Sequence, residues 1–497
     1  MRPYRLIPII ALAGLASAAI GFGCVSTDCE FATCPPATSS GGLDATDDSV
    51  QPPAGCDPKI DAKDAPNCVS NDFAVFVDAR GDDANAGTKE APVKTIKAAL
   101  EKRNGKPRIY ICEGSYDEHV KVTSSTSLIG GFSCGAWVYA NTRAKFAPTT
   151  PGFALHVTDV PKAPERPVIS DLEFTALAGS APSESSIAAF INAAEVTVRR
   201  VRLAAGAGVS GVAGSKGVTA TPTPANLNGE PGADAPGGAG GATKKCTCSA
   251  GGYSEGGKGG DLFGEVNGKD GTVIPTVIEP AGNDGKGGTQ SSCQDTGTGG
   301  RAGSNGTKGE SATSPSRALT ANGWEPGNGA SGADGKPGQG GGGGGGKSTN
   351  PGPGGGGGGA CGGCQGTGGG GGGAGGSSIA LVVLDATVAL ENGELVASDA
   401  GDGKDGAVGG DGQFGGLGGI RVGGCSGGNG GTGGPGGAGA GGAGGISAGI
   451  LWKGIEPTVD DTTKAATVTG RAGIGGNGGI PKQNDGPPGI ADKIVAL

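Results

Sequence analysis

The sequence predicts an all-β fold in which short strands stack as successive coils, and long glycine-rich segments interrupt the stack. The main observation is a repeated layout. Residues 185–208 and 377–401 both begin Ser-Ser-Ile-Ala and contain two β-rich runs before glycine takes over. Glycine supplies 112 of the 497 residues and aromatic residues only 4%. A chain of this composition can build a hydrophobic core only in its β-rich parts.

Strands are expected where short β-branched and aromatic runs lie between turn residues. The first runs are at residues 73–77, 108–112, 119–122 and 127–131. Paired runs follow at 153–157 with 168–177, 187–191 with 196–203, 379–384 with 388–396, and 446–452 with 466–469. An Ala-Gly pair follows each second run, at 178–179, 205–206, 400–401 and 472–473. We therefore expect every glycine-rich insertion to leave its coil at the same corner.

One helix is expected over residues 92–103, between a turn-rich loop and Asn104-Gly105. Pro92 suits the first turn of a helix, and apolar residues at positions 93, 96 and 100 fall on one helical face. A stack of coils has open ends that aggregate unless they are covered. This helix is placed to cover the first coil.

Residues 73–135 carry a resemblance to a known family. The run Val-Asp-Ala-Arg-Gly-Asp-Asp-Ala-Asn-Ala-Gly-Thr-Lys-Glu-Ala-Pro-Val-Lys-Thr-Ile-Lys-Ala-Ala-Leu at 77–100, with Arg-Ile-Tyr-Ile-Cys-Glu-Gly-Ser-Tyr at 108–116, resembles the opening of pectin-lyase-like proteins. The resemblance implies a right-handed parallel β-helix, and right-handed crossovers are the general rule for parallel strands. The whole layout also resembles glycine-rich lipoproteins of predatory soil bacteria such as myxobacteria, which have no assigned function.

Glycine recurs with a period of three in the second insertion, residues 402–445. From Gly403 to Gly445, glycine occupies every third position except Arg421. This period fits stacked polyproline-II-like helices, a disordered linker is the alternative, and the sequence leaves both open. The first insertion, residues 206–376, keeps the period only in patches and has all-glycine runs at 340–346, 354–359 and 368–373. We expect the first insertion to be disordered.

The N-terminus is typical of an export signal. Arg2 and Arg5 precede an apolar run at residues 6–20, which is short for a membrane span. Cys24 follows, as in bacterial lipoprotein signals, and this resemblance implies a lipid on Cys24 and a membrane partner, at the outer membrane or cell surface. Plain secretion is the alternative. Residues 24–70 are rich in Ser, Thr, Asp, Pro and Gly and are expected to be a flexible tether.

These observations divide the chain into seven expected parts. They are a signal peptide (1–23), a tether (24–70), the first part of the β-helix (71–205), an insertion (206–376), one coil (377–401), a second insertion (402–445) and terminal coils (446–497).

The cysteines indicate disulfides in an oxidising compartment. There are 13, and removing Cys24 leaves an even number. Proximity suggests the pairs Cys29–Cys34, Cys56–Cys68, Cys112–Cys134, Cys246–Cys248 or a neighbour, and Cys361–Cys364, with Cys293 and Cys425 left over. Cys112 and Cys134 are about one coil of roughly 20–25 residues apart, so a bond there would join consecutive coils. A zinc site from Cys246, Cys248, Cys361 and Cys364 is the alternative.

The sequence does not reveal a chemical activity. A net charge of −9 argues against a nucleic-acid partner. Gly346-Lys347-Ser348 is not followed by a helix of useful length, so it is not expected to bind phosphate. The acidic loop with Asp57, Asp61 and Asp64 is expected to be solvated, and calcium binding is the alternative.

An acid/base site has few candidates. They are the carboxylates Asp171, Glu173, Glu391 and Glu394 near strand ends, and the histidines His119 and His156. Solvated carboxylates and structural histidines are the simpler interpretation, so we assign no catalytic residue, metal or cofactor. We expect a structural, adhesive or carbohydrate-binding surface protein, with polysaccharide or other cell-surface components as partners. The alternative is a polysaccharide lyase or glycoside hydrolase on a β-helix.

Overall fold

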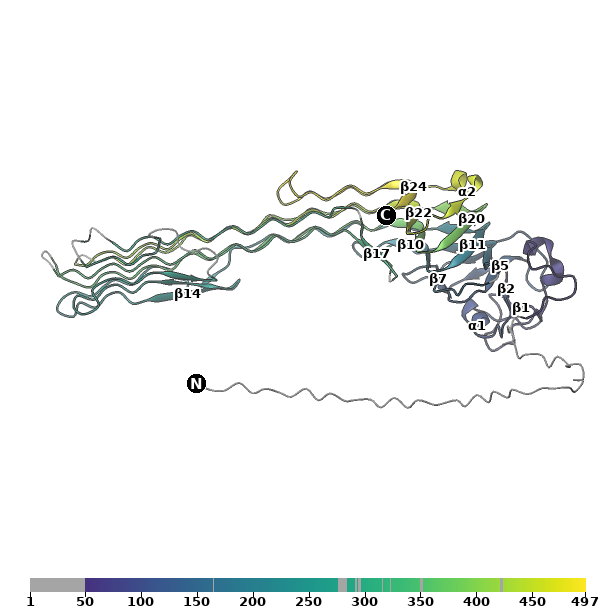
Figure 1. Ribbon diagram of the computed structural model, residues 1–497, viewed down its shortest axis with the longest axis horizontal. Coiled ribbons are helices and arrows are strands. Elements are labelled where there is room, and N and C mark those ends of the chain that lie inside the picture. Colours follow the sequence, from purple (N-terminus) through teal and green to yellow (C-terminus); the bar gives the residue numbers. More distant parts are fainter. Residues whose placement is uncertain are drawn as a thin grey trace, which may run out of the picture. The chain divides into compact units, whose positions relative to one another are not determined.

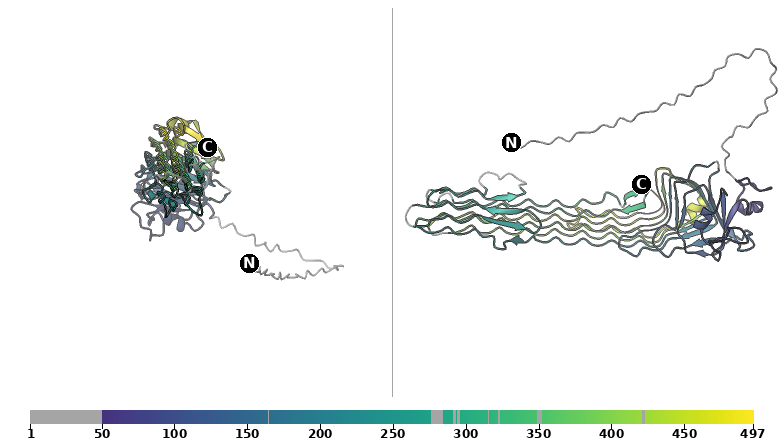
Figure 2. Two further views of the ribbon diagram at one scale, coloured as in Figure 1. Left: turned by 90° about the vertical axis from the view of Figure 1, so that its left-hand side faces the viewer. Right: turned by 90° about the horizontal axis from the view of Figure 1, so that it is seen from below.

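The computed structural model describes residues 50–163, 165–275, 284–290, 293, 296–314, 316–321, 323–348, 352–420 and 423–497, and these belong to one compact unit. The unit is mostly β-structure. Three parallel sheets stack as in a parallel β-helix, and glycine-rich segments run out from them and back (Figures 1 and 2). In the described residues we find no helix with the length and apolar character of a membrane span. The expected export signal, Cys24, Cys29 and Cys34 lie outside the described residues.

Each coil contributes strands to the three sheets. The seven-stranded sheet contains β1 (Ala74–Val77), β2 (Arg108–Cys112), β5 (Ser127–Phe132), β8 (Val168–Ser170), β11 (Glu195–Arg199), β20 (Thr387–Glu391) and β23 (Thr458–Val459). The six-stranded sheet contains β4 (Val120–Val122), β7 (Leu155–Thr158), β10 (Ser186–Asn192), β19 (Ser378–Leu384), β22 (Ser447–Lys453) and β24 (Ala491–Ala496). The five-stranded sheet contains β3 (Ser115–Tyr116), β6 (Ala144–Phe146), β9 (Leu172–Thr175), β12 (Arg202–Ala204) and β21 (Glu394–Val396).

The two similar stretches of sequence are neighbouring coils. β10 and β19 pair in parallel with Ser186 opposite Ser378 and Asn192 opposite Leu384. The runs expected at 168–177, 196–203 and 388–396 are each two strands, because one residue turns the chain into the next sheet. These corner residues have positive φ: Asp171 (57°), Arg200 (52°) and Asn392 (53°). Asp and Asn tolerate this left-handed conformation better than most residues.

The core of the β-helix is built from stacked apolar side chains. Tyr116, Phe146 and Phe174 stack from β3 to β9, with ring centroids 4.8 and 5.2 Å apart. Leu203 lies opposite Phe174, and Leu395 lies opposite Leu203 in the next strand. All five side chains are buried. Because parallel strands pair in register, equivalent positions of successive coils form continuous apolar columns.

The helix α1 (Ile96–Glu101) covers the first coil, as expected, but it is shorter than predicted. Val93 continues the strand ladder instead: its N–H donates to the Phe76 carbonyl, and its own carbonyl accepts from Asp78. Thr95 then caps the helix, because its side chain accepts a hydrogen bond from the Ala98 N–H.

A second helix, α2 (Asp461–Ala466), was not expected. The side chain of Asp460 caps its N-terminus by accepting a hydrogen bond from the Thr463 N–H. The strand expected at 466–469 is wrong, since only Val468 makes a β-bridge there, with Val396.

Residues 50–72 are folded against the β-helix, so the expected tether does not extend through them. Two 3₁₀ turns, Ala62–Asp64 and Pro66–Cys68, lie within the loop that the Cys56–Cys68 disulfide closes. Ala62 and Val69 belong to an apolar cluster with the outer-face aromatic residues Phe76, Tyr110, Phe132 and Trp137. The segment therefore covers aromatic side chains that the first strands turn away from the core.

The glycine-rich insertions form a bundle of extended segments. The segments that run away from the β-helix are 206–232, 327–346, 400–420 and 471–480, and the returning ones are 296–310, 354–376, 424–445 and 484–489 (Figure 2). Their backbone hydrogen bonds recur at every third residue, as a threefold polyproline-II helix requires. One such ladder joins the N–H groups of Gly208, Gly211, Gly214 and Gly217 to the carbonyls of Asp399, Asp402, Asp405 and Val408.

The expectation of disorder for 206–376 is therefore wrong for its described residues, and the ordered alternative holds for the described part of 402–445. The all-glycine runs lie inside the bundle, where neighbours leave no space for a Cβ. A Cβ added at Gly343 would lie 2.0 Å from the Lys258 carbonyl oxygen, and one at Gly359 would lie 1.9 Å from that of Gly341. On the outer segment 400–420, by contrast, every third residue from Asp405 to Ile420 is exposed.

Two antiparallel elements complete the bundle. At the end far from the β-helix lies a sheet of β13 (Pro222–Thr223), β14 (Lys244–Cys248), β15 (Tyr253–Gly256) and β16 (Thr272–Ile274) (Figure 1). The hairpin of β17 (Ser316–Thr320) and β18 (Gly323–Pro326) lies back on the β-helix, where Leu319 and Trp324 join an apolar cluster with Phe153 and Phe190.

The insertions leave the β-helix at one corner, as expected. The chain departs after β12 and after β21 of the five-stranded sheet and returns into β19 and β22 of the six-stranded sheet.

Candidate functional site

The four carboxylates proposed for acid/base chemistry lie on the outside of the β-helix, and all four are in ion pairs. Two belong to a charge ladder across the five-stranded sheet. Glu173 on β9 pairs with Lys145 on β6 at 3.6 Å and with Arg202 on β12 at 3.1 Å, and Arg202 pairs with Glu394 on β21 at 3.1 Å. These residues lie directly opposite one another in the strand register. Opposite charges in such cross-strand pairs stabilise a sheet.

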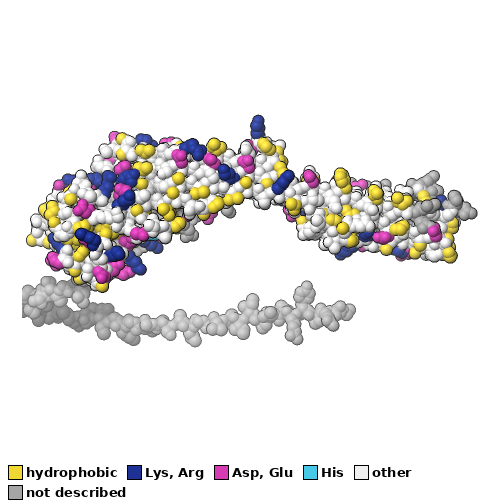
Figure 3. Space-filling model, turned by 180° about the vertical axis from the view of Figure 1, so that it is seen from behind, with side chains coloured by type: hydrophobic (Ala, Val, Ile, Leu, Met, Phe, Trp, Pro, Cys, Tyr) yellow, Lys and Arg dark blue, Asp and Glu magenta, His cyan; other side chains and the backbone are white. Residues whose placement is uncertain are grey.

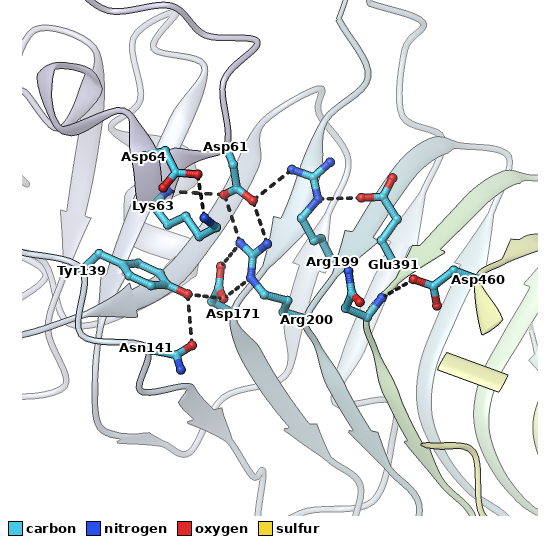
Figure 4. Close-up of polar contacts among 11 residues, drawn as sticks. Asp61, Lys63, Asp64, Tyr139, Asn141, Asp171, Arg199, Arg200, Glu391 and Asp460 are labelled. Atoms are coloured by element: carbon cyan, nitrogen blue, oxygen red, sulfur yellow. Dashed lines mark hydrogen bonds and ion pairs between the residues drawn. The ribbon is translucent and has the colours of Figure 1, made fainter. Parts of the chain in front are cut away.

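The other two carboxylates join a cluster at the next corner (Figure 4). The Arg200 guanidinium donates to both carboxylate oxygens of Asp171 at 2.7 Å and to both oxygens of Asp61 at 2.7 and 3.0 Å. The Tyr139 hydroxyl donates to Asp171 at 2.9 Å. Arg199 beside it pairs with Glu391 at 2.6 Å. Arg200 thus joins the folded N-terminal segment to a corner of the β-helix.

The surroundings of this cluster hold each of its titratable groups discussed below in one protonation state near neutral pH. Burial would raise the pKa of Asp61, but hydrogen bonds and the charge of Arg200 outweigh burial and lower that pKa. Burial and the neighbouring Asp171 raise the pKa of Tyr139 to about 12. Burial alone would lower the pKa of Arg200, but its two carboxylate partners raise it. A general acid or base works best with a pKa near the working pH, and these three groups are shifted away from neutrality.

The two histidines make structural contacts. The ring nitrogens of His119 lie 2.8 Å from the Phe153 carbonyl oxygen and 2.8 Å from the Thr150 hydroxyl. His156 stacks on Phe190 with ring centroids 5.3 Å apart. Burial and the charge of Lys121 lower its pKa, and its buried Nε2 has no hydrogen-bond partner in the described part of the chain.

The part of the chain that the structure describes contains five disulfides. Cys56–Cys68 and Cys112–Cys134 are bonded, with Cα atoms 4.7 and 4.9 Å apart. The pairs Cys246–Cys248 and Cys361–Cys364, expected from proximity, are wrong. The bonds are Cys246–Cys361, Cys248–Cys364 and Cys293–Cys425, which join segments 115 to 132 residues apart in the sequence.

The cysteine sulfur atoms of two possible metal sites are used in disulfide bonds. All four cysteines of the zinc alternative are bonded in this way. Asp78 also lies close to the sulfurs of Cys112 and Cys134, but these two are bonded to each other.

The acidic loop and the lysine motif have structural partners. Asp61 binds Arg199 and Arg200, Asp64 binds Lys63, and Asp57 accepts a hydrogen bond from the Lys59 N–H. Lys347 forms a backbone bridge with Gly354. These contacts do not resemble a calcium loop or a phosphate loop.

The far end of the bundle combines disulfide bonds with exposed apolar side chains. Its antiparallel sheet is joined to the central segments by Cys246–Cys361 and Cys248–Cys364. Four large side chains there are strongly exposed: Phe263 (73%), Phe414 (82%), Leu417 (60%) and Ile420 (73%). Figure 3 shows basic and acidic side chains intermingled on the β-helix, whereas the bundle surface is largely backbone and uncharged side chains, with scattered hydrophobic and charged ones.

Sequence reasoning missed this apolar end. The signal was present, because positions 408, 411, 414, 417 and 420 read Val, Asp, Phe, Leu, Ile between glycines. In a threefold helix these positions share one outward edge.

Comparison with known proteins gives one local match. A family model described as "Protein of unknown function (DUF1565)" matches residues 79–128, which span α1, β2, β3 and β4 and reach the start of β5. No curated protein and no solved structure matches the chain. The matched stretch contains the opening of the β-helix and none of the glycine-rich bundle.

Proposed function

We propose that this protein has a structural or adhesive role at a cell surface, with the β-helix as its base and the far end of the bundle as its binding end. The observation that carries this proposal is the combination of exposed apolar side chains with disulfide bracing at one end of the bundle. Exposed apolar patches of a few hundred Å² often mark interaction sites.

The bundle is suited to hold such an end in place. Its segments are joined along their length by backbone hydrogen bonds at every third residue. A pair of disulfides connects β14 to the central segment 354–376. A surface held in one conformation loses less entropy on binding than a flexible loop does, and this favours adhesion through the far end.

The disulfides also indicate where the protein resides. Five disulfides indicate a protein that resides outside the cytoplasm. We further propose a lipid anchor on Cys24, and a relation of the β-helix to the right-handed pectin-lyase-like proteins. Replacing Cys24 with Ala is expected to release the protein from membranes into the medium, and an unchanged membrane fraction would remove the anchor from this proposal.

Polysaccharide cleavage has weaker support. Asp171, Glu173, Glu391 and Glu394 are all in ion pairs, so a free acid/base pair is not prepared on this face. We therefore place binding ahead of catalysis, with cell-surface polysaccharide as the first ligand class to test.

The test compares two sets of exposed apolar residues on the bundle. The Phe414→Ser/Leu417→Ser/Ile420→Ser variant is expected to lose binding to immobilised cell-wall and extracellular polysaccharides and to whole cells. The matched Val212→Ser/Val218→Ser variant, changed nearer the β-helix, is expected to retain it. Equal binding by both variants would contradict the proposed end. Release of soluble products from a polysaccharide, abolished by Glu173→Gln, would replace adhesion with catalysis.

A further inference from the structure

The last excursion of the chain, residues 468–490, covers only the part of the bundle next to the β-helix. Its outward segment is held by two backbone ladders. The N–H groups of Ala400, Gly403 and Gly406 donate to the carbonyls of Arg471, Ile474 and Asn477 at 2.8–2.9 Å. The N–H groups of Gly473, Gly476 and Gly479 donate to the carbonyls of Gly445, Gly442 and Gly439 at 2.8–3.0 Å.

A row of carboxylates adds a third ladder. Asp399, Asp402 and Asp405 stand three residues apart and accept hydrogen bonds from the backbone N–H groups of Arg471, Ile474 and Asn477 at 2.7–2.9 Å. Each turn of the added segment is therefore held by a backbone donor, a backbone acceptor and an aspartate.

The same groups continue beyond residue 480, where this segment turns back. The next donors are the N–H groups of Gly409, Gly412 and Gly415, the next acceptors are the carbonyls of Gly436, Gly433 and Gly430, and the next carboxylate is Asp411. None of these groups has a hydrogen-bond partner in the parts of the chain that the structure describes. We call these seven residues the distal slot.

The slot keeps the geometry of the occupied part. A Cβ added at Gly403 or Gly406 would lie 2.1 or 2.3 Å from the carbonyl oxygens of Gly442 and Gly439. A Cβ added at Gly409, Gly412 or Gly415 would lie 2.1, 1.8 or 2.2 Å from those of Gly436, Gly433 and Gly430. The two bordering segments therefore stay at the same separation and register past the turn.

The slot has a defined length. At its far end Gly418 donates to the Asn429 side chain at 2.9 Å, which uses the next donor in the row. Three free donors at every third residue correspond to an extended chain of about nine residues, or roughly 28 Å. The exposed side chains of Val408, Phe414 and Leu417 lie along the same bordering segment.

We propose that the distal slot binds an extended, glycine-rich strand of another protein chain, with glycine at every third position. The established contact with residues 468–480 specifies this chemistry. A Cβ on Gly473 or Gly476 would lie 1.9 or 2.1 Å from the carbonyl oxygens of Gly401 and Lys404, so a strand in the same row needs glycine there. Addition of a strand to an open hydrogen-bonding edge is a known mode of peptide recognition. The proposal does not depend on adhesion by the far end.

The probe is a synthetic peptide with the sequence of residues 468–480, titrated into the full-length protein. Saturable binding by calorimetry is expected at peptide concentrations up to about 1 mM. In NMR spectra the amides of Gly409, Gly412 and Gly415 are expected to shift, and those of Gly403 and Gly406 are expected to stay unchanged. A peptide with Ala at the positions of Gly473 and Gly476 should bind at least tenfold more weakly. The Asp411→Ala variant should weaken binding roughly tenfold, and Glu265→Ala, an exposed control, should not.

Three results would overturn the proposal. They are no saturable binding at about 1 mM peptide, equal binding of the Ala-substituted peptide, and shifts at Gly403 and Gly406 in place of the slot amides. The slot amides could also shift when the protein concentration is raised without any peptide. That result would show that a second copy of this chain fills the slot, and it would overturn the assignment to a different protein.

Discussion

The β-helix and the glycine-rich bundle use the same stacking of extended chain, but different groups hold them together. In the β-helix, apolar columns such as Tyr116, Phe146 and Phe174 fill the interior between the three sheets. In the bundle, the interior is backbone: the central runs around Gly343 and Gly359 are packed so closely that a Cβ would overlap neighbouring carbonyls. One region therefore depends on side-chain burial, and the other depends on backbone hydrogen bonds and the absence of side chains.

The comparison explains why the disulfides are distributed as they are. Three of the five connect distant segments of the bundle, over 115 to 132 residues. The bundle buries few large apolar side chains, so burial does little to offset the entropy of ordering a long excursion. Covalent closure of long loops opposes that entropy most directly.

The largest expected effect comes from removing two disulfides of the bundle, which should destabilise the bundle and leave the β-helix unchanged. Changing Cys246, Cys248, Cys361 and Cys364 together to Ala should lower the stability of the far sheet by about 4–5 kcal/mol, the chain-entropy value for a loop near 100 residues. Removing only one pair should cost much less, because the other closes a loop of almost equal length. Amide exchange of β14 measures the loss, with β10 as the internal control. Equal loss in β10 would show that the two regions unfold as one.

A smaller effect is expected from the charged corner of the β-helix. Arg200→Ala leaves the buried carboxylate of Asp171 without its cation, which should lower the free energy of unfolding by roughly 3 kcal/mol. Arg199→Ala, which breaks the more exposed pair with Glu391, should cost less than about 1 kcal/mol. Urea unfolding followed by circular dichroism compares the two. Similar losses of stability in the two variants would mean that the contacts of Arg200 contribute no more than those of the more exposed Arg199.

Two adjacent glycines test the packing of the bundle. A Cβ at Gly300 would lie 2.0 Å from the Gln339 carbonyl oxygen, whereas the nearest atom to a Cβ at Gly299 is 3.7 Å away. Gly300→Ala should therefore destabilise the bundle by roughly 2 kcal/mol, and Gly299→Ala should be neutral or slightly stabilising. Thermal unfolding of the two variants side by side is sufficient. Equal tolerance of both would contradict close backbone packing.

The smallest expected effect concerns pH. The folded-state pKa of His156 is lowered by burial and by Lys121, so the unfolded state takes up the proton first as pH falls below its ordinary value of about 6.5. The contribution of His156 to the free energy of unfolding is therefore complete above that pH and is lost as the pH falls below it. His156→Phe keeps the stacking on Phe190 and removes the titration, so its stability relative to wild type should rise between pH 7 and pH 5. A pH-independent difference would show that His156 does not titrate in this range.

The β-helix could be predicted because its signal is local and repeated. Runs such as 108–112 and 187–191 became strands, and the Ser-Ser-Ile-Ala repeat became neighbouring strands in register. Corner positions were harder: Asp171 and Arg200 interrupt long β-rich runs through positive φ angles that composition does not encode. The folded segment 50–72 was missed because Asp61 looks like a solvated acid until Arg200 is placed beside it.

The bundle could be predicted only in part, because order there depends on neighbours. A surface segment such as 402–420 needs glycine at one position in three, and this period was visible. An interior segment such as 354–359 needs glycine almost everywhere, and its sequence then looks like a flexible linker. The disulfides Cys246–Cys361 and Cys248–Cys364 were missed for the same reason, since their partners meet only when distant segments pack together.

Residue-resolved amide hydrogen exchange of the bundle tests the central claim, that the insertions are ordered by backbone hydrogen bonds with a period of three. Along the outer segment, the amides of Gly403, Lys404, Gly406 and Ala407 donate to carbonyls of neighbouring segments. The amides of Asp405 and Val408 have no hydrogen-bond partner within the described residues, and both residues are exposed. The account predicts slow exchange at the first four amides and fast exchange at the last two. Uniformly fast exchange across residues 403–408 would contradict it, because a disordered glycine linker has no such period.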